Sequence, residues 1–405
     1  MKMVNDTYYE LKNRNYYKKQ FDNGEGKRNV LFVDPVMHNF DLYTMIMPYL
    51  SMEDETHRTA MTGMYKYSEI DEKPATIISH TEVKWASVIV IPMSLENFTA
   101  ADGLFQDLRS TNPEIKIIHT VEFDYYEMTN DHPALQFSEE IKKKLTPEKI
   151  KEIKEKMIIR YAENCAGADR IMVLNSNLAQ KLNEKGFSDV KRCPILIDQE
   201  MFSENINFDE TMGIKNTAGI VFMSIELSES SLSAFKGYIP ILKKIKQKYQ
   251  DKFRLIIITV GKGKSLFKGL DFKVGHIAKN SIINQYNAIV KSSADFHLVL
   301  NRNNKYFANT EPLFTYVERG MFGIPIVSIP VSPYKEIIKH EENGYIIKKK
   351  SDLLDLVGSM IKDKKKLIKL SSRLKEDVTK HFQIDDEKTE YLMSVFFDGY
   401  SFESE

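Results

Sequence analysis

Short apolar runs rich in valine and isoleucine alternate with helical stretches along this chain, and this alternation constrains the fold more than any other feature of the sequence. Strands that are buried on both faces of a parallel sheet read as continuous apolar runs. In the first half the runs are NVLFVDP (29–35), ASVIVIPM (86–93), IKIIHTVEF (115–123) and DRIMVLNS (169–176). We therefore predict a mostly parallel sheet with helices on both faces.

The stretch after Thr146 is the clearest helix between these strands. Threonine is a favoured N-cap residue, and Pro147 suits the first helical position because the first turn does not need its N–H. Apolar residues then recur at helical spacing, namely Ile150, Ile153, Met157, Ile158 and Tyr161. The pattern predicts a helix that begins at Pro147.

The strand pattern starts again in the second half, with the runs GIVFMSIE (219–226), FRLIIITVG (253–261), DFKVGHI (271–277), ADFHLVLN (294–301), GIPIVSIP (323–330) and GYIIKK (344–349). The sequence therefore predicts an α/β protein with two doubly wound, Rossmann-like domains facing a cleft, and ligands beyond the carboxyl ends of the strands. We expect an N-terminal extension (1–27), a first domain (28–203), a second domain (204–384) and a last helical segment (385–405) that can pack back on the first domain.

Composition excludes several classes of protein. Lysine plus arginine and aspartate plus glutamate both number 57, so the formal net charge of zero gives no global attraction to nucleic acid or membrane. Two cysteines, Cys165 and Cys193, cannot make a disulfide framework, and no Cys/His cluster has zinc spacing. We expect neither a signal peptide nor a transmembrane segment, and a cytoplasmic location.

The stretch RLIIITVGKGKS (254–265) ends a predicted strand in Gly-Lys-Ser, as a P-loop does. A P-loop also needs a glycine five residues before Gly263, and that position is Ile258, inside the strand. The spacing therefore excludes an NTPase P-loop. Gly261 and Gly263 still make a tight turn from strand to helix, which either brings its amides to a phosphate or is a plain turn.

Two glutamates, Glu311 and Glu318, stand in the stretch NTEPLFTYVERGMFGIPIVS (309–328). If the chain is helical from Glu311 to the glycine at 323, with Asn309 or Thr310 as its cap, both glutamates lie on one face about 10 Å apart along the axis. Carboxylates only accept hydrogen bonds, which suits them to sugar hydroxyls. The pattern equally fits an ordinary solvated helix face.

The order of the motifs in the second half resembles the nucleotide-sugar-binding half of GT-B glycosyltransferases. The resemblance covers residues 160–375 well and 28–160 loosely. Its motifs are GADRIMVLNS (167–176), VKRCPILIDQEMF (190–202), FKGY (235–238), LIIITVGKG (255–263), the run from FKVGHI to ADFHLVLN (272–301), and EPLFTYVERGMFGIPIVS with the turn ENGYII (311–347). We therefore expect a nucleotide-sugar-binding second domain and an acceptor-side first domain.

The resemblance also implies roles for single residues. Glu318 would hold the ribose hydroxyls of the donor and Glu311 the transferred sugar, while Lys236 and the turn with Gly261 and Gly263 would lie against the diphosphate. The arginine that accompanies this lysine in the family is absent, because the matching strand end reads SIELSESS (224–231). Arg302 is a candidate for supplying that charge.

Lys305 is a second candidate for the missing positive charge, without a motif behind it.

Two further departures from the family pattern concern the spacing of the glutamates and the loop after the first strand. The family's two glutamates are usually one residue further apart than here. The glycine-rich loop after the first strand is replaced by DPVMHNFDLY (34–43).

On the acceptor side, the strand IKIIHTVEF and the residues after it carry His119, Glu122 and Asp124. An inverting transferase needs a general base, for which His119, Glu122 and Asp124 are candidates, with His38 as another. A retaining enzyme can use the departing phosphate instead, and the resemblance favours retention. A lone histidine at a strand end can also be a structural hydrogen-bonding group.

Two lysine-rich stretches, 139–156 and 242–254, have apolar residues at helical spacing. Their lysines are then a solvated helix face, or alternatively a surface for peripheral contact with an anionic membrane or a DNA backbone.

We expect from the resemblance a hexosyltransferase-like enzyme that moves a sugar from a UDP-sugar such as UDP-glucose to a glycan, lipid, protein or modified DNA. The motifs require no metal and no cofactor beyond the nucleotide-sugar co-substrate. Two alternatives stay open: a phage-type DNA-base glycosyltransferase, and a non-catalytic GT-B-like binding module.

Overall fold

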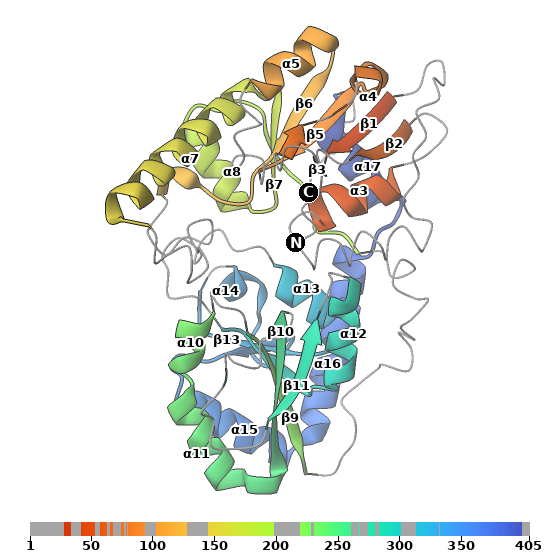
Figure 1. The fold of residues 1–405 in the computed structure, drawn as a ribbon. Coiled ribbons are helices and arrows are strands. Elements are labelled where there is room, and N and C mark those ends of the chain that lie inside the picture. Colours follow the sequence, from red (N-terminus) through yellow and green to blue (C-terminus); the bar gives the residue numbers. More distant parts are fainter. Residues whose placement is uncertain are drawn as a thin grey trace. The chain divides into compact units, whose positions relative to one another are not determined.

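The computed structural model describes residues 28–33, 42–52, 57–62, 65–67, 74–76, 78, 80–93, 103–127, 145–197, 219–227, 231–260, 267, 274–279, 283–300, 313–331 and 333–398. These residues fall into two compact units (Figure 1). The N-terminal unit contains the described residues up to Leu196 and from Ile384 onward, and the C-terminal unit contains those of Ile197–Gln383.

The N-terminal unit has a six-stranded sheet in the order β2-β1-β5-β6-β7-β8, in which every neighbouring pair is parallel. Its strands are β1 (Arg28–Val33), β2 (His57–Thr62), β5 (Val88–Pro92), β6 (Lys116–Thr120), β7 (Arg170–Val173) and β8 (Val190–Arg192). A separate antiparallel pair consists of β3 (Tyr65–Tyr67) and β4 (Pro74–Thr76). Four strands, β1, β5, β6 and β7, coincide with the predicted apolar runs, so those predictions are confirmed.

The helical segments of this unit are a π-helix, Leu42–Ile46, followed directly by α3 (Met47–Ser51), then α4 (His80–Trp85), α5 (Leu104–Thr111), a 3₁₀ turn at Tyr125–Glu127, α7 (Pro147–Gly167), α8 (Ser176–Glu184) and α17 (Asp386–Phe396). The predicted start of α7 is confirmed, because Thr146 caps it and its hydroxyl accepts a hydrogen bond from Lys149 N at 3.3 Å. Among the helices that the structure describes, none is long and apolar enough to cross a membrane.

Helix α17 belongs to the N-terminal unit although it lies at the other end of the sequence. Its Phe396 ring packs edge-on against Phe32 of β1, with the ring centroids 5.8 Å apart. Arg170 of β7 is 4% exposed and donates from Nη1 to the carbonyl oxygen of Val395 at 2.8 Å. The same guanidinium pairs with Asp398 at 2.6 Å and with Asp189 at 2.8 Å. One buried arginine therefore ties the C-terminal segment to the sheet.

The C-terminal unit has a second six-stranded parallel sheet, in the order β11-β10-β9-β12-β13-β14. Its strands are β9 (Val221–Leu227), β10 (Phe253–Val260), β11 (Gly275–Lys279), β12 (Phe296–Leu298), β13 (Ile326–Ser328) and β14 (Gly344–Ile346). All six overlap the predicted runs. Numbered along this unit alone the order is 3-2-1-4-5-6, that of a dinucleotide-binding Rossmann fold. The predicted α/β class with two doubly wound sheets is confirmed.

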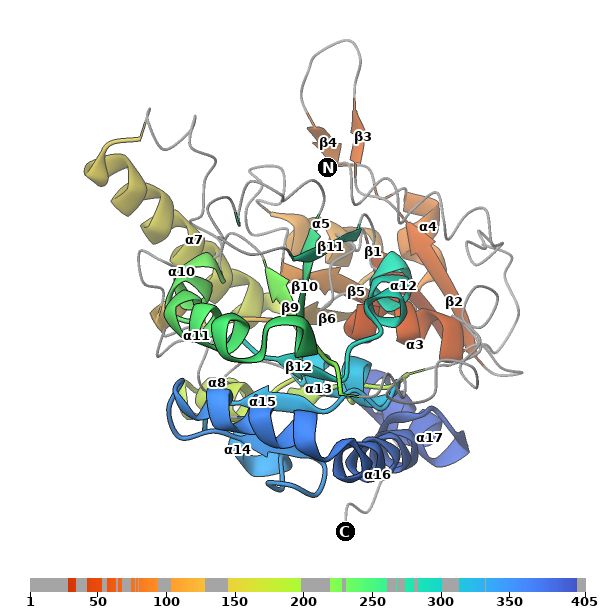
Figure 2. The ribbon, with the colours of Figure 1, turned by 90° about the horizontal axis from the view of Figure 1, so that it is seen from below.

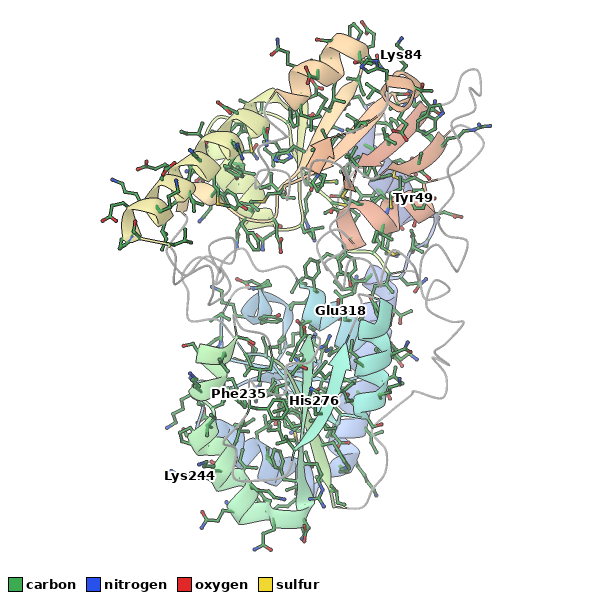
Figure 3. The ribbon with its side chains drawn as sticks, in the orientation of Figure 1. Tyr49, Lys84, Phe235, Lys244, His276 and Glu318 are labelled. Carbon is green, nitrogen blue, oxygen red and sulfur yellow. The ribbon has the colours of Figure 1, made fainter. Side chains whose placement is uncertain are left out.

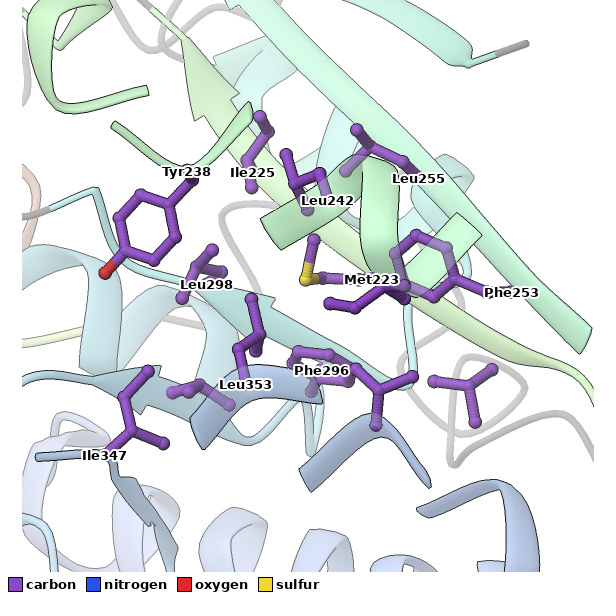
Figure 4. Packing of buried hydrophobic residues seen from close by; sticks show 14 of the residues in the cluster. Met223, Ile225, Tyr238, Leu242, Phe253, Leu255, Phe296, Leu298, Ile347 and Leu353 are labelled. Carbon is purple, nitrogen blue, oxygen red and sulfur yellow. The ribbon is translucent and has the colours of Figure 1, made fainter. Parts of the chain in front are cut away.

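The helices of the C-terminal unit are α10 (Leu232–Lys236), α11 (Ile239–Tyr249) with a 3₁₀ turn at Gln250–Lys252, α12 (Ile283–Ser292), α13 (Phe314–Gly320), α14 (Tyr334–Ile337), α15 (Asp352–Lys362) and α16 (Lys364–Phe382). Figure 2 shows α11 on one side of the sheet and α12 on the other. The core on the α11 side is closely packed (Figure 4).

Strand β9 shows why the two faces of this sheet differ. Met223 and Ile225 are fully buried in the core on the α11 side (Figure 4). Because side chains alternate along a strand, Ser224 and Glu226 face the opposite side. A polar face at the centre of a parallel sheet requires partners for each buried polar group.

Arg170→Met keeps most of the side chain's length and removes its hydrogen bonds to α17. We expect the free energy of unfolding to fall by about 1–3 kcal/mol, because buried carbonyl groups lose their donor. Arg109→Met is the matched control, since its pair with Asp169 has side chains 37% and 40% exposed. Such a pair contributes about 0–1 kcal/mol. Urea denaturation measures both variants, and equal losses would contradict the role assigned to Arg170.

Candidate functional site

The helix with the second predicted glutamate is shorter than the sequence suggested. Helix α13 begins at Phe314, with Leu313 at the N-cap position and no capping side chain. Glu311, from which the sequence would start the helix, lies outside the described residues. The predicted end at Gly323 fits, because this residue has a left-handed φ of 64° just beyond the helix.

Glu318 lies in α13 and is almost completely buried, with a side chain 1% exposed (Figure 3). Its Oε2 accepts a hydrogen bond from Nη1 of the adjacent Arg319 at 2.9 Å. Arg319 is also 1% exposed, and its Nη2 donates to Oε2 of Glu226 at 2.8 Å. Glu226, Arg319 and Glu318, called the Arg319 cluster below, thus join the end of β9 to α13.

The sheet topology places the Arg319 cluster at a position where ligands bind in doubly wound folds. Strand order reverses between β9 and β12, which makes this pair the topological switch point, and Glu226 is the penultimate residue of β9. Ligands bind beyond the carboxyl ends of the strands at such a point. Glu226 has a side chain 29% exposed, far more than the other two members of the cluster.

A second polar pair lies on the same face of the sheet. Ser224 and His297 stand opposite each other in the register of β9 and β12, and Ser224 Oγ lies 2.9 Å from His297 Nδ1. Both residues are buried. The face at the switch point is therefore polar from Ser224 to Glu226, while the face toward α11 is apolar.

The charges of the Arg319 cluster are uneven. Two carboxylates share one guanidinium, which gives the cluster a formal net charge of −1. The Nε of Arg319 is buried and has no hydrogen-bond partner among the residues that the structure describes. A buried guanidinium is stable only while charged partners surround it, so Arg319 depends on both glutamates.

Lys236 is the last residue of α10 and is exposed. A second lysine approaches the residue that follows it, because the ammonium of Lys350 occupies the space where a Cβ on Gly237 would be. Nζ of Lys350 is 4.8 Å from the centroid of the Tyr238 ring. Gly237, at the junction of α10 and α11, therefore has one lysine before it in sequence and the ammonium of another beside it in space.

The structure places His119 on β6 with no exposed surface. Its Nδ1 lies 3.2 Å from the carbonyl oxygen of Ile91, and its ring contacts Phe105 edge-on. Asp124 is also fully buried, and its Oδ1 accepts a hydrogen bond from Tyr126 N at 3.0 Å. This geometry favours the structural hydrogen-bonding role for His119 that the sequence left open, and it gives Asp124 a turn-forming role.

The other predicted site residues lie outside the described part of the chain. They are Glu311, Gly261, Gly263, Arg302, Lys305 and His38. Their assigned roles stay predictions. Of the donor-side residues, Glu318 and Lys236 are described, both in the C-terminal unit.

Arg319 was not among the residues predicted from the sequence, and Glu226 was predicted only as a departure from the family pattern. The sequence around each of these two residues does contain a pattern that indicates a buried charge. Arg319 follows Val317 and Glu318 in a helix whose neighbours are apolar, and a charged pair in an apolar stretch indicates buried partners. A glutamate at the end of an apolar strand is the complementary half of such a pair.

Neither a protein-family model nor a curated protein matches this sequence. Solved structures match in fold. Sucrose-phosphate synthase from Thermosynechococcus elongatus matches with a TM-score of 0.58 at 11% identity, over 91% of this chain and 98% of that chain. HepE of Anabaena in complex with UDP-glucose matches with a TM-score of 0.52 at 12% identity, over 91% of this chain and 98% of that chain.

A mutant of S. aureus TarM in complex with UDP matches with a TM-score of 0.50 at 13% identity. That match includes 77% of this chain but only 54% of the TarM chain, so this chain spans about half of TarM's length. At these identities the likeness concerns the fold. The resemblance to GT-B glycosyltransferases is therefore confirmed at the level of fold.

A double-mutant cycle tests the Arg319 cluster. Arg319→Met leaves Glu318 buried without its guanidinium partner, so we expect the free energy of unfolding to fall by about 3–5 kcal/mol. Adding Glu318→Gln removes the stranded charge, and we expect the double variant to recover about 1–3 kcal/mol relative to Arg319→Met. Chemical denaturation of wild type, both single variants and the double variant measures the coupling. Strict additivity would contradict the ion pair.

Proposed function

We propose that this protein is a glycosyltransferase that moves a sugar from a nucleotide-sugar donor, expected to be a UDP-sugar, to an acceptor. The observation that carries the proposal is the pair of consecutive doubly wound sheets, which align over 91% of the chain with HepE bound to UDP-glucose. The ordered donor-side motifs of residues 160–375 support the same function independently of the fold.

The donor binds to the C-terminal unit in this proposal. Its diphosphate lies near Lys236, where the ammonium of Lys350 adds a second positive charge. These charges stabilise the diphosphate as it departs. The ribose hydroxyls bind at the Arg319 cluster around Glu318, because carboxylates accept from hydroxyl groups. Glu311 takes the transferred sugar.

The proposed reaction is a displacement at the anomeric carbon of the donor sugar. The bond from that carbon to the diphosphate oxygen breaks, and a bond from the acceptor oxygen forms. The buried, hydrogen-bonded positions of His119 and Asp124 support a retaining course, in which the acceptor's proton goes to the departing phosphate rather than to a side chain.

A second candidate is a GT-B-like module that binds the donor without transferring its sugar. Glu226 favours it, since this acidic residue stands at the strand end where the family has an arginine that neutralises the leaving diphosphate. Incubation with UDP-glucose, other UDP-hexoses and ADP- and GDP-sugars, with released nucleotide and sugar as the readout, distinguishes the two. Binding without release supports the module, and neither binding nor release for any donor would overturn both candidates.

Lys236→Ala tests the proposed diphosphate contact. Each charge-assisted hydrogen bond contributes about 1.5–3 kcal/mol, so we expect kcat/KM for the donor to fall about 10- to 100-fold. Lys244→Ala is the matched control, because Lys244 is an exposed lysine of the neighbouring α11 (Figure 3). We expect the control to keep wild-type kinetics. Similar losses in both variants would point to general surface charge instead.

A further inference from the structure

Helix α16 carries its charges unevenly around its axis. Its buried side consists mainly of apolar residues, namely Leu367, Leu370, Leu374 and Val378, with Lys364 and Ser371 beside them. Lys365, Lys369 and Arg373 are exposed and stand four residues apart. With about 3.6 residues per turn, they lie within about 80° of one another around the helix and span about 12 Å along its axis. These three residues, called the α16 stripe below, form one line of positive charge.

The structure neutralises the lysines beside the stripe but not the stripe itself. The ammonium of Lys364 pairs with the buried Asp295 at 3.0 Å, and the ammonium of Lys366 pairs with Glu341 at 2.6 Å. Within the described part of the chain, no carboxylate pairs with the side chain of a stripe residue. Like charges four residues apart destabilise a helix slightly. The stability of α16 therefore does not explain the stripe.

Helix α7 shows the opposite arrangement in the same chain. Lys149 and Lys156 both pair with Glu152, at 2.7 and 2.9 Å. Lys151 pairs with Glu155 at 3.8 Å. This helix carries its own counter-charges, which favours the solvated face that the sequence left open for its lysines. The formal net charge of the whole chain is zero, so the unneutralised charge of α16 is a local feature.

We propose that the α16 stripe binds the phosphate backbone of a nucleic-acid duplex. A duplex carries about one negative charge per 1.7 Å of its axis, so the length of the stripe faces about seven phosphates. Each cation therefore meets a phosphate without a particular register, and such contacts carry no sequence information. The inference does not rest on the proposed function, which assigns no residue of α16 to the donor or the acceptor.

The surroundings of the stripe favour a linear polyanion over an anionic membrane. A helix that enters a membrane surface needs a free apolar face, and in α16 that face is buried, with Leu370 2% and Leu374 0% exposed. Glu376 is exposed and follows three residues after Arg373, so it lies on the same side of the helix. A flat anionic surface would approach this carboxylate, whereas a backbone can cross the helix at the stripe alone.

Helix α16 is also held firmly from the side opposite the stripe. The hydroxyl of Ser371 donates to the carbonyl oxygen of Gly323, just beyond α13. The hydroxyl of Tyr316 in α13 donates to Oδ2 of Asp377 at 3.0 Å. The backbone that carries the stripe is therefore fixed before a partner arrives, and less freedom is lost on binding.

The test measures binding of a DNA duplex of about 20 base pairs to the full chain by fluorescence anisotropy, between about 50 and 200 mM salt and without nucleotide sugar. For three phosphate contacts we expect the logarithm of the association constant to fall against the logarithm of salt concentration with a slope of about −3. In the triple variant Lys365→Gln, Lys369→Gln, Arg373→Gln we expect affinity at the lowest salt to fall about 10- to 100-fold. We also expect the slope to lose about one unit per residue replaced.

The triple variant Lys149→Gln, Lys151→Gln, Lys156→Gln is the matched control. It removes the same formal charge from exposed lysines that already have counter-charges. We expect its affinity to stay within about twofold of the wild type, because salt screens charges that do not touch the duplex over about 10 Å. The melting temperature of the stripe variant should be no lower than that of the wild type, since like charges no longer repel. That result separates lost binding from unfolding.

Three outcomes would overturn the inference. The first is a wild type that does not bind the duplex at the lowest salt. The second is an equal loss of affinity in both triple variants, which would indicate an effect of overall charge. The third is a stripe variant that binds the duplex like the wild type but no longer binds vesicles containing phosphatidylserine, which would assign the stripe to a membrane.

Discussion

The buried guanidinium of Arg319 is the interaction on which the C-terminal unit's polar face depends. A charge with a side chain 1% exposed is tolerated only when opposite charges meet it directly, and Glu226 and Glu318 do so from two different elements. The pairing fixes α13 against the end of β9, at the point where the strand order reverses. The two ion pairs that allow this charge to be buried therefore also set the geometry of the candidate site.

Much of the fold could be predicted from the sequence because the strands of a parallel sheet that is buried on both faces appear in the sequence as continuous apolar runs. Of the twelve strands in the two described six-stranded sheets, ten lie within or overlap apolar runs. The two others, β2 and β8, were not predicted, and the reasons are physical. Strand β2 reads HRTAMT and lies at an edge, and β8 is a three-residue edge strand with two exposed side chains. Edge strands often carry charged or polar side chains, as β2 does at His57, Arg58 and Thr59, so their sequences carry weaker apolar signals.

The candidate site was less predictable than the fold because it depends on pairs that are distant in sequence. Glu226 and Arg319 are 93 residues apart, and no local pattern shows that they meet. His119 shows a second kind of difficulty: its place at a strand end is compatible with chemistry or with structure, and the sequence alone does not show that it is fully buried beside the carbonyl of Ile91. Residue type and position suggest candidates, and burial decides which of them a ligand can reach.

The return of α17 to the first sheet has a consequence for how the protein is made. The bonds from Arg170 to Val395 and Asp398 close only after more than 200 further residues have been added, since these partners stand 225 and 228 positions later. On a ribosome that adds about 5–20 residues per second, the N-terminal unit waits on the order of ten seconds or more for its last helix. The described residues of the C-terminal unit all lie between Ile197 and Gln383, so its sheet can be completed first. The domain that begins the chain is thus the one that finishes folding last.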